Sequence, residues 1–168
     1  RVHYSVGDHP STSEPVKSLN SQLVEIPLLE GGVIDEAKFL ESLDKDSKLV
    51  VLSHVNNQSG NHYDILSLGK KVKDKFPNIH IHVDGVQGLT KVETNLSSLI
   101  DSYTISGHKI GAPKGVGALF IKDGVEVETQ LHGGGHEFGI RSSTVNTPLI
   151  LSLCEAITAG LEDVITNN

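Results

Sequence analysis

The chain has 168 residues, of which 37% are hydrophobic and 21% are charged. This composition is typical of a folded globular domain and excludes a disordered tail, a collagen-like repeat and a disulfide-rich miniprotein. The 21 acidic and 14 basic residues give a formal charge of −7, which argues against a nucleic-acid-binding protein.

Short apolar runs and a single cysteine bear on where the protein resides. No run is long enough to span a bilayer or to serve as a secretory signal, so we expect a soluble protein with no membrane partner. Cys154 cannot form an internal disulfide, which fits a reducing compartment. We therefore expect an intracellular, cytoplasmic protein, with a mitochondrial location left open. The chain has no methionine and begins with Arg1, so we expect it to be part of a longer polypeptide.

The first part of the chain alternates between strand and helix patterns. Residues 2–6 predict a short strand, followed by a polar loop over 7–15. A second strand is expected over 22–28, and residues 35–43 have the apolar spacing of a helix. The continuous apolar run 49–52 predicts a strand that is buried on both faces, as in a parallel sheet.

A crossover unit and a less regular second half follow. A helix is predicted over 63–75 and a strand over 79–83 that ends at Asp84, which together with strand 49–52 makes a right-handed strand–helix–strand unit. The remaining expected elements are a short helical or irregular link over 92–100, a strand over 102–106, a glycine-rich loop over 107–117, an antiparallel strand over 116–122, a further strand over 126–131, and a helix from Pro148 with Leu149, Leu153, Ala156, Ile157, Leu161 and Val164 on one face. These elements predict an α/β fold with a mostly parallel sheet between helices.

Polar residues follow three of the expected strands, at 56–57, 84–87 and 106–109. Ligands of open α/β sheets bind beyond the carboxyl ends of the strands, so these residues are candidates for one crevice. Asp84 and Lys109 form a pair suited to pyridoxal phosphate: the lysine makes a Schiff base, and the acid keeps the pyridine nitrogen protonated. A turn-capping aspartate and an ordinary surface lysine would explain the same spacing.

Four sequence blocks carry more specific information. They are His54-Val55-Asn56-Asn57, His82-Val83-Asp84-Gly85-Val86-Gln87, the segment from Ser106-Gly107-His108-Lys109 to Leu119, and the segment from His132-Gly133-Gly134-Gly135-His136-Glu137 to Thr144. Their content and order resemble the cysteine desulfurase and selenocysteine lyase family. This family belongs to the class V aminotransferase group of the fold type I pyridoxal-phosphate-dependent enzymes.

The resemblance implies a role for each matched residue around pyridoxal 5′-phosphate. Lys109 is expected to form the Schiff base and to move the substrate α-proton, while Asp84 pairs with the pyridine nitrogen. The other implied contacts are Asn57 and Gln87 to the ring hydroxyl, Ser106 and His108 to the phosphate, Thr144 to the phosphate of the neighbouring subunit in a homodimer, and His9 stacked on the ring, where it assists proton transfer.

The remaining histidines and the single cysteine give no indication of a metal site or of a further nucleophile. His132 and His136 are separated by Gly133-Gly134-Gly135, which makes helical ligand spacing implausible, and with His80 and His82 they predict no metal site. Cys154 lies among apolar residues of the final helix, which predicts a core thiol rather than a nucleophile.

The resemblance places residues 1–168 in the central part of the large, cofactor-binding domain, without the N-terminal phosphate-loop segment and the C-terminal small domain. It implies a parent enzyme that removes sulfur from L-cysteine, or selenium from selenocysteine, and leaves alanine, with a sulfur-acceptor protein as a further partner. The nucleophilic cysteine and the arginine that binds the substrate carboxylate are expected outside this chain, so residues 1–168 alone are predicted to be inactive. Two alternatives are a non-catalytic binding scaffold of the same fold and another pyridoxal-phosphate-dependent lyase or aminotransferase of the group.

Overall fold

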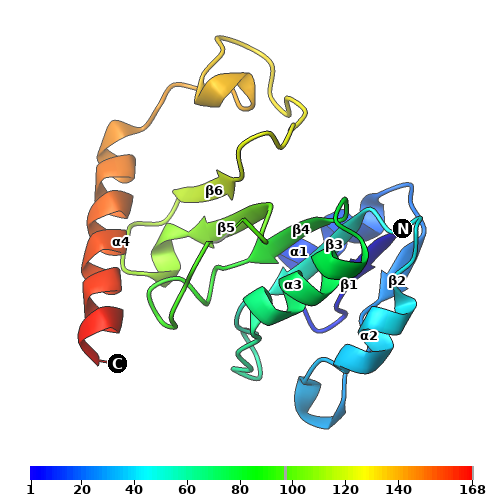
Figure 1. The fold of residues 1–168 in the computed structure, drawn as a ribbon. Coiled ribbons are helices and arrows are strands. Elements are labelled where there is room, and N and C mark those ends of the chain that lie inside the picture. The colour runs from blue at the N-terminus through cyan, green and yellow to red at the C-terminus, as the bar shows by residue number, and fades with distance from the viewer. Residues whose placement is uncertain (97, 168) are drawn as a thin grey trace.

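The computed structural model describes residues 1–96 and 98–167 (Figure 1). Strands of the described residues form one sheet in the order β2-β1-β3-β4-β5-β6. They are β1 (Val2–Tyr4), β2 (Leu23–Glu25), β3 (Leu49–Ser53), β4 (His80–Asp84), β5 (Ser102–Ser106) and β6 (Gly117–Ile121). The first five run parallel and β6 runs antiparallel to β5, which confirms the predicted mostly parallel α/β sheet.

Helices cover both faces of this sheet. They are α1 (Pro10–Ser18), α2 (Glu36–Ser42), α3 (Ile65–Lys75) and α4 (Thr147–Asn167), with short 3-10 turns η1 (Glu30–Gly32), η2 (Gly107–Lys109) and η3 (Glu137–Gly139). α3 and α1 lie on opposite faces, and α4 stands at the β5–β6 end of the sheet (Figure 1). Among the described residues, no helix combines the length and the apolar character needed to cross a membrane.

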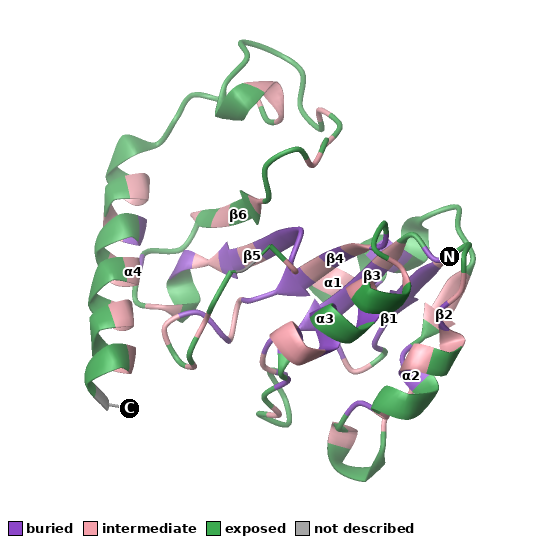
Figure 2. Cartoon of the chain, in the orientation of Figure 1, coloured by how far each residue is buried: buried purple, intermediate pink, exposed green. Residues whose placement is uncertain are grey.

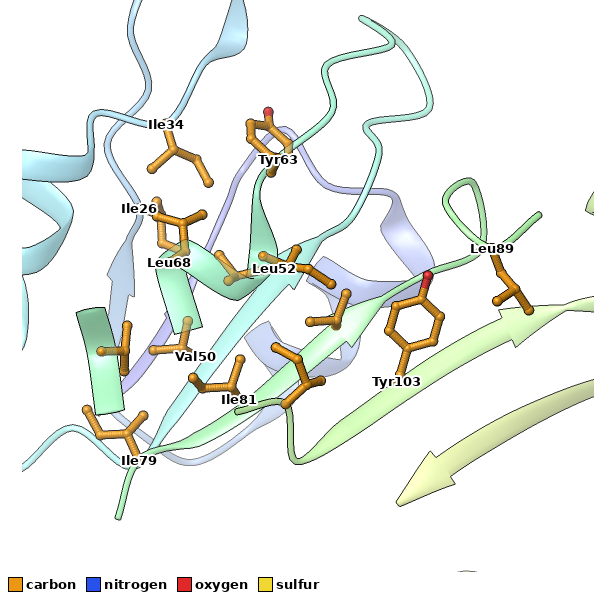
Figure 3. Packing of buried hydrophobic residues seen from close by; sticks show 14 of the residues in the cluster. Ile26, Ile34, Val50, Leu52, Tyr63, Leu68, Ile79, Ile81, Leu89 and Tyr103 are labelled. Atoms are coloured by element: carbon orange, nitrogen blue, oxygen red, sulfur yellow. The ribbon is translucent and has the colours of Figure 1, made fainter. Parts of the chain in front are cut away.

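Alternation along β3 explains why the two faces are both apolar. Val50 and Leu52 pack with α3 in the main core, whereas Val51 joins Val16 of α1 in a second, smaller core. Figure 3 shows the main core between α3 and the central strands. Buried residues concentrate on the inner strands, while most of α4 and the segment between β6 and α4 are exposed (Figure 2). The central strands therefore form the rigid part of the described chain.

Most predicted elements are confirmed, but the expected polar loop over 7–15 is wrong in its second half. Residues 10–18 form α1, although the segment contains few apolar side chains. The ring of His9 caps the helix by accepting a hydrogen bond from the Ser11 backbone N–H, and Pro10 occupies the first turn, where its missing N–H costs nothing. Helix initiation by these two residues outweighs the loop-like composition.

Two further expectations differ from the structure, at residues 126–131 and at Cys154. Residues 126–131 form no strand, because only the bridge between Leu131 and Arg141 gives this segment a backbone partner of the sheet type. By contrast, the described part of the 92–100 link is irregular, which agrees with the expected helical or irregular link; Ser97 lies outside the described residues. The thiol of Cys154 is exposed rather than in the core, whereas the apolar face predicted for α4 is its less exposed face, with Leu153 buried.

Directly after β4, the chain passes against a buried tyrosine. The Tyr103 side chain is 1% exposed, and its hydroxyl lies 2.9 Å from Nδ1 of His54. A Cβ atom on Gly85 would stand only 1.9 Å from two ring carbons of Tyr103. Glycine at position 85 is therefore required by the tyrosine that packs beneath it, not by a turn conformation.

We predict that Gly85→Ala destabilises the protein by about 1–3 kcal/mol, because the extra methyl group overpacks the Tyr103 ring. Replacing the ring as well, in Gly85→Ala/Tyr103→Leu, should recover part of this loss. Urea unfolding of the single and double variants measures both effects.

The matched control is Gly69→Ala in α3, where a new Cβ meets its nearest neighbours at 3.5 Å, an ordinary contact distance. Alanine is the better helix former, so this variant should be as stable as wild type or slightly more stable. Equal stability of the two alanine variants would contradict the packing argument.

Candidate cofactor site

Three parallel strands end at the same edge of the sheet and surround a cavity of about 370 Å³. This volume is within the usual range for small-molecule sites. The cavity is lined by His9, Ser11, Ser53, Val55, Asn57, Asp84, Val86, Gln87, Ser106, His108 and Lys109. The structure thus brings together every site residue proposed from sequence except Thr144, which is exposed in the segment before α4 and does not line the cavity.

Asp84 is held at the floor of the site by two hydrogen bonds. Its side chain is 8% exposed, Oδ1 accepts from the backbone N–H of Val86 at 3.0 Å, and Oδ2 accepts from the hydroxyl of Thr12 at 2.7 Å. Thr12 lies in the first turn of α1, where the helix dipole also favours a nearby negative charge. These contacts fix the orientation of the carboxylate relative to the cavity.

Lys109 ends the η2 turn at the mouth of the cavity. The turn packs tightly, since a Cβ on Gly107 would meet the backbone oxygen of Val116 at 3.0 Å. Within the described part of the chain, the exposed Lys109 amine makes no hydrogen bond or ion pair. The pKa of nearby Lys91 is lowered, first by the burial of Lys91 and second by the positive charge of Lys109. The amine is thus free of competing partners.

Ser106 and His108 face the cavity from either side of Gly107. The Ser106 hydroxyl and Nδ1 of His108 are 2.9 Å apart, so the two side chains are already oriented toward each other. A hydroxyl and an imidazole are both able to donate hydrogen bonds to an anion. This pair is the anion-binding candidate of the site.

Within the described residues, His9 and Gln87 each have one side-chain polar atom that is hydrogen-bonded and another that is not. Nδ1 of His9 accepts from the Ser11 backbone, which leaves Nε2 as the free edge of the ring. Oε1 of Gln87 accepts from the Lys91 ammonium, which leaves the amide NH₂ group as the available donor. Asn57 also lines the cavity, and its neighbour Asn56 ties the His9 loop down by donating to the Gly7 carbonyl at 2.8 Å.

Two supporting contacts around this edge were not found from sequence. Thr12 bonds Asp84, and Ser53 donates a 2.7 Å hydrogen bond to Oδ1 of the buried Asp8. The partners are 72 and 45 residues apart in the chain, so no local pattern reveals them. The only available signal was the polar character of Ser53 at the end of an apolar strand.

Burial shifts the pKa values of two groups behind the cavity in opposite directions. Burial, opposed by the Ser53 hydrogen bond and reinforced by the charge of Asp84, raises the pKa of Asp8 to about 6. Burial, with a smaller contribution from His62, lowers the pKa of His54 to about 4. In both cases the low-dielectric surroundings favour the neutral form.

The side chains present fit pyridoxal phosphate. The cavity combines an unpaired lysine amine, an oriented buried carboxylate and a serine–histidine pair able to hold an anion, which match the aldehyde, the ring nitrogen and the phosphate of that cofactor. With its mostly parallel sheet, the chain has the architecture of the fold type I pyridoxal-phosphate-dependent enzymes, in incomplete form. Residues 1–158 match the aminotransferase class-V family, and the chain belongs to this family.

Known relatives agree with this assignment. The chain is 36% identical to the cysteine desulfurase IscS of Pseudomonas fluorescens (strain SBW25) over 167 residues, which are 96% of this chain and 41% of the relative. A solved NifS-like protein has a TM-score of 0.94 and 30% identity, over 98% of this chain and 46% of its own. A structure of SspA in complex with cysteine has a TM-score of 0.85 and 29% identity, and the match covers 94% of this chain and 46% of SspA. The chain thus spans less than half the length of these relatives.

We predict that Asp8→Asn changes how stability depends on pH. The folded state binds the Asp8 proton more tightly than the unfolded state, so this group makes the wild type lose free energy of unfolding as the pH rises from about 4 to about 6. The free energy lost in this way is about 3 kcal/mol, which the asparagine variant should retain at neutral pH. Urea unfolding of both proteins across this pH range makes the comparison, and parallel curves would contradict it.

Proposed function

We propose that this chain is the central part of the large domain of a pyridoxal-phosphate-dependent cysteine desulfurase. The observation that carries the proposal is the convergence of Asp84 and Lys109 on one cavity, with Ser106 and His108 beside the lysine. Two relatives support the substrate: one is named a cysteine desulfurase, and another was solved with cysteine. Removal of selenium from selenocysteine is the variant of this reaction that the same site would serve.

In this proposal the chain's residues hold the cofactor by its two ends. The Lys109 amine would hold the aldehyde carbon, and the Asp84 carboxylate would pair with the ring nitrogen. Ser106 and His108 would donate hydrogen bonds to the phosphate, while Asn57 and the free NH₂ of Gln87 would face the ring hydroxyl. When bound, the cofactor supplies an electron-withdrawing ring that takes up the electron pair left at Cα of the substrate.

Proton movement is assigned to Lys109 and His9. The Lys109 amine, once released from the aldehyde, would accept the proton from Cα of the substrate. His9 would stack on the ring and assist through Nε2, since Nδ1 is engaged with Ser11. The role of Asp84 is to hold the ring nitrogen protonated, which requires its carboxylate to stay in the orientation fixed by Thr12.

The rest of the proposed reaction needs groups beyond residues 1–168. A nucleophilic cysteine must take the sulfur from the substrate, and an arginine must bind the substrate carboxylate. A sulfur-acceptor protein would then receive the sulfur. The exposed Cys154 on α4 does not line the cavity and is not assigned this role. Thr144 is proposed to contact the phosphate of a neighbouring subunit in a homodimer, in keeping with its exposure away from the cavity.

We predict that pyridoxal phosphate forms a covalent, borohydride-reducible link to Lys109, seen as an absorption band at the edge of the visible range. Lys109→Ala should lose the band and the link. The matched control is Lys114→Ala, which removes an exposed lysine of the same loop that does not line the cavity and should keep both. Peptide mass analysis after reduction locates the modified residue, and labelling at any other lysine would overturn the site.

We predict that residues 1–168 alone release no alanine from cysteine, whereas the complete protein that carries this chain does. The reason is the expected location of the nucleophilic cysteine and the substrate-binding arginine outside the chain. Cys154→Ser in the complete protein should leave alanine release within about twofold of wild type, as expected for a surface substitution. Alanine release by residues 1–168 alone would refute this division of roles. Loss of alanine release from the complete protein with Cys154→Ser would refute it as well.

A further inference from the structure

Asp8 is a buried carboxyl group that the proposed mechanism does not use. Its side chain is 7% exposed, and Oδ2 has no hydrogen-bond partner among the described residues. An ionised carboxylate in such a place pays for desolvation without full compensation, so the protonated form is favoured. An unpartnered buried polar atom of this kind calls for a functional explanation.

Asp8 is connected to the cavity although it does not line it. Its Oδ1 accepts the hydroxyl of Ser53, the last residue of β3, and Ser53 pairs in register with Asp84, the last residue of β4. Both Ser53 and Asp84 line the cavity, as does His9, the next residue after Asp8. Two carboxyl groups are thus held at neighbouring positions of the same sheet edge.

We propose that Asp8 is a positioning residue that stores a proton while the charge of Asp84 is unpaired and releases that proton to solvent when a cationic ring nitrogen pairs with Asp84. This inference rests on the proposed function. The step breaks one O–H bond of Asp8 and passes the proton to the buffer, with no other covalent change. Its effect, around pH 6 and below, is to add a second negative charge behind Asp84 when the cation is in place.

The groups that face Asp8 support this coupling. Asp84 of β4 is one of the causes that raise the pKa of Asp8, and a cation paired with Asp84 cancels that repulsion. Tyr63, just before α3, has a pKa that is raised mainly by burial and to a smaller extent by the charge of Asp8. The His9 ring is hydrogen-bonded to Ser11. No lysine, arginine or histidine pairs with Asp8 in the described part of the chain. Of the charged groups that face Asp8, Asp84 is therefore the one whose pairing would change the proton affinity of Asp8, in addition to the larger effect of burial.

Linkage gives the proposal a measurable signature. If cation binding lowers the proton affinity of Asp8, then loss of the proton must strengthen cation binding by the same factor. The affinity for pyridoxal phosphate should then rise with pH through the region around 6 more steeply in wild type than in Asp8→Asn. The difference is about tenfold for each unit by which binding lowers the pKa of Asp8.

The test measures protons released when pyridoxal phosphate binds to the complete protein that carries this chain, by calorimetry in two buffers of different ionisation enthalpy. Around pH 6, wild type should release a larger fraction of a proton than Asp8→Asn, and the excess should vanish well above and well below that pH. The matched control Asp123→Asn removes an exposed carboxylate outside the cavity and should release protons as wild type does.

Ser53→Ala provides a second variant with a directional outcome. The Ser53 hydroxyl lowers the pKa of Asp8, so its removal should move the excess release to higher pH, an effect that loss of packing alone would not produce. Equal release from wild type and Asp8→Asn, or loss of cofactor binding in Asp8→Asn, would overturn this inference while the proposed function stands. Failure of wild type to bind pyridoxal phosphate would overturn both.

Discussion

The parallel register of β3, β4 and β5 is the constraint on which the rest of the site depends. It pairs Ser53 with Asp84 and Asp84 with Thr104, so that the segments after these strands leave the sheet at one edge. The register is secured by burial on both faces, because a slip of one residue would turn the side chains of the α3 core toward α1. A cavity lined by a lysine, a carboxylate and the serine–histidine pair proposed to bind an anion is thus a consequence of how apolar residues alternate along three short strands.

The start of α1 is the second support of the site. This helix packs on the face of the sheet opposite to α3. Three contacts fall within residues 8–12. Asp8 accepts a hydrogen bond from Ser53, and His9 caps the helix. The Thr12 hydroxyl donates a hydrogen bond to Asp84. Asn56 fastens the preceding Gly7 to the loop that follows β3. The proposed ring-stacking histidine and the proposed partner of the ring nitrogen are therefore positioned by one helix terminus, so that a shift of α1 would move both together.

Sequence patterns predicted the central strand β3 from its continuous apolar run and α2, α3 and α4 from their apolar spacing. They made Asp84 and Lys109 candidates because both come at the ends of expected strands. The roles of the other cavity residues came from the family resemblance. What could not be predicted depends on contacts made at a distance. α1 has only Val16 as a buried apolar side chain and is initiated by a histidine cap, while residues 126–131 alternate like a strand but lack a neighbouring strand to pair with. Burial of Asp8 and exposure of Cys154 likewise follow from packing, which local composition does not report.

The two halves of the cavity differ in burial and hydrogen bonding in a way that suits the chemistry proposed for them. Asp84 is buried, doubly hydrogen-bonded and attached to the core strands, which suits a carboxylate whose direction relative to a ring nitrogen must not change. Lys109 is exposed, makes no ion pair within the described residues and lies on a short turn after β5, which suits an amine proposed first to hold an aldehyde and then to reach a proton on the substrate. The proposed reaction asks one lysine to perform both tasks in turn beside an acid that stays in place, and the fold puts the buried acid on a strand end and the exposed amine on the turn beyond the next strand.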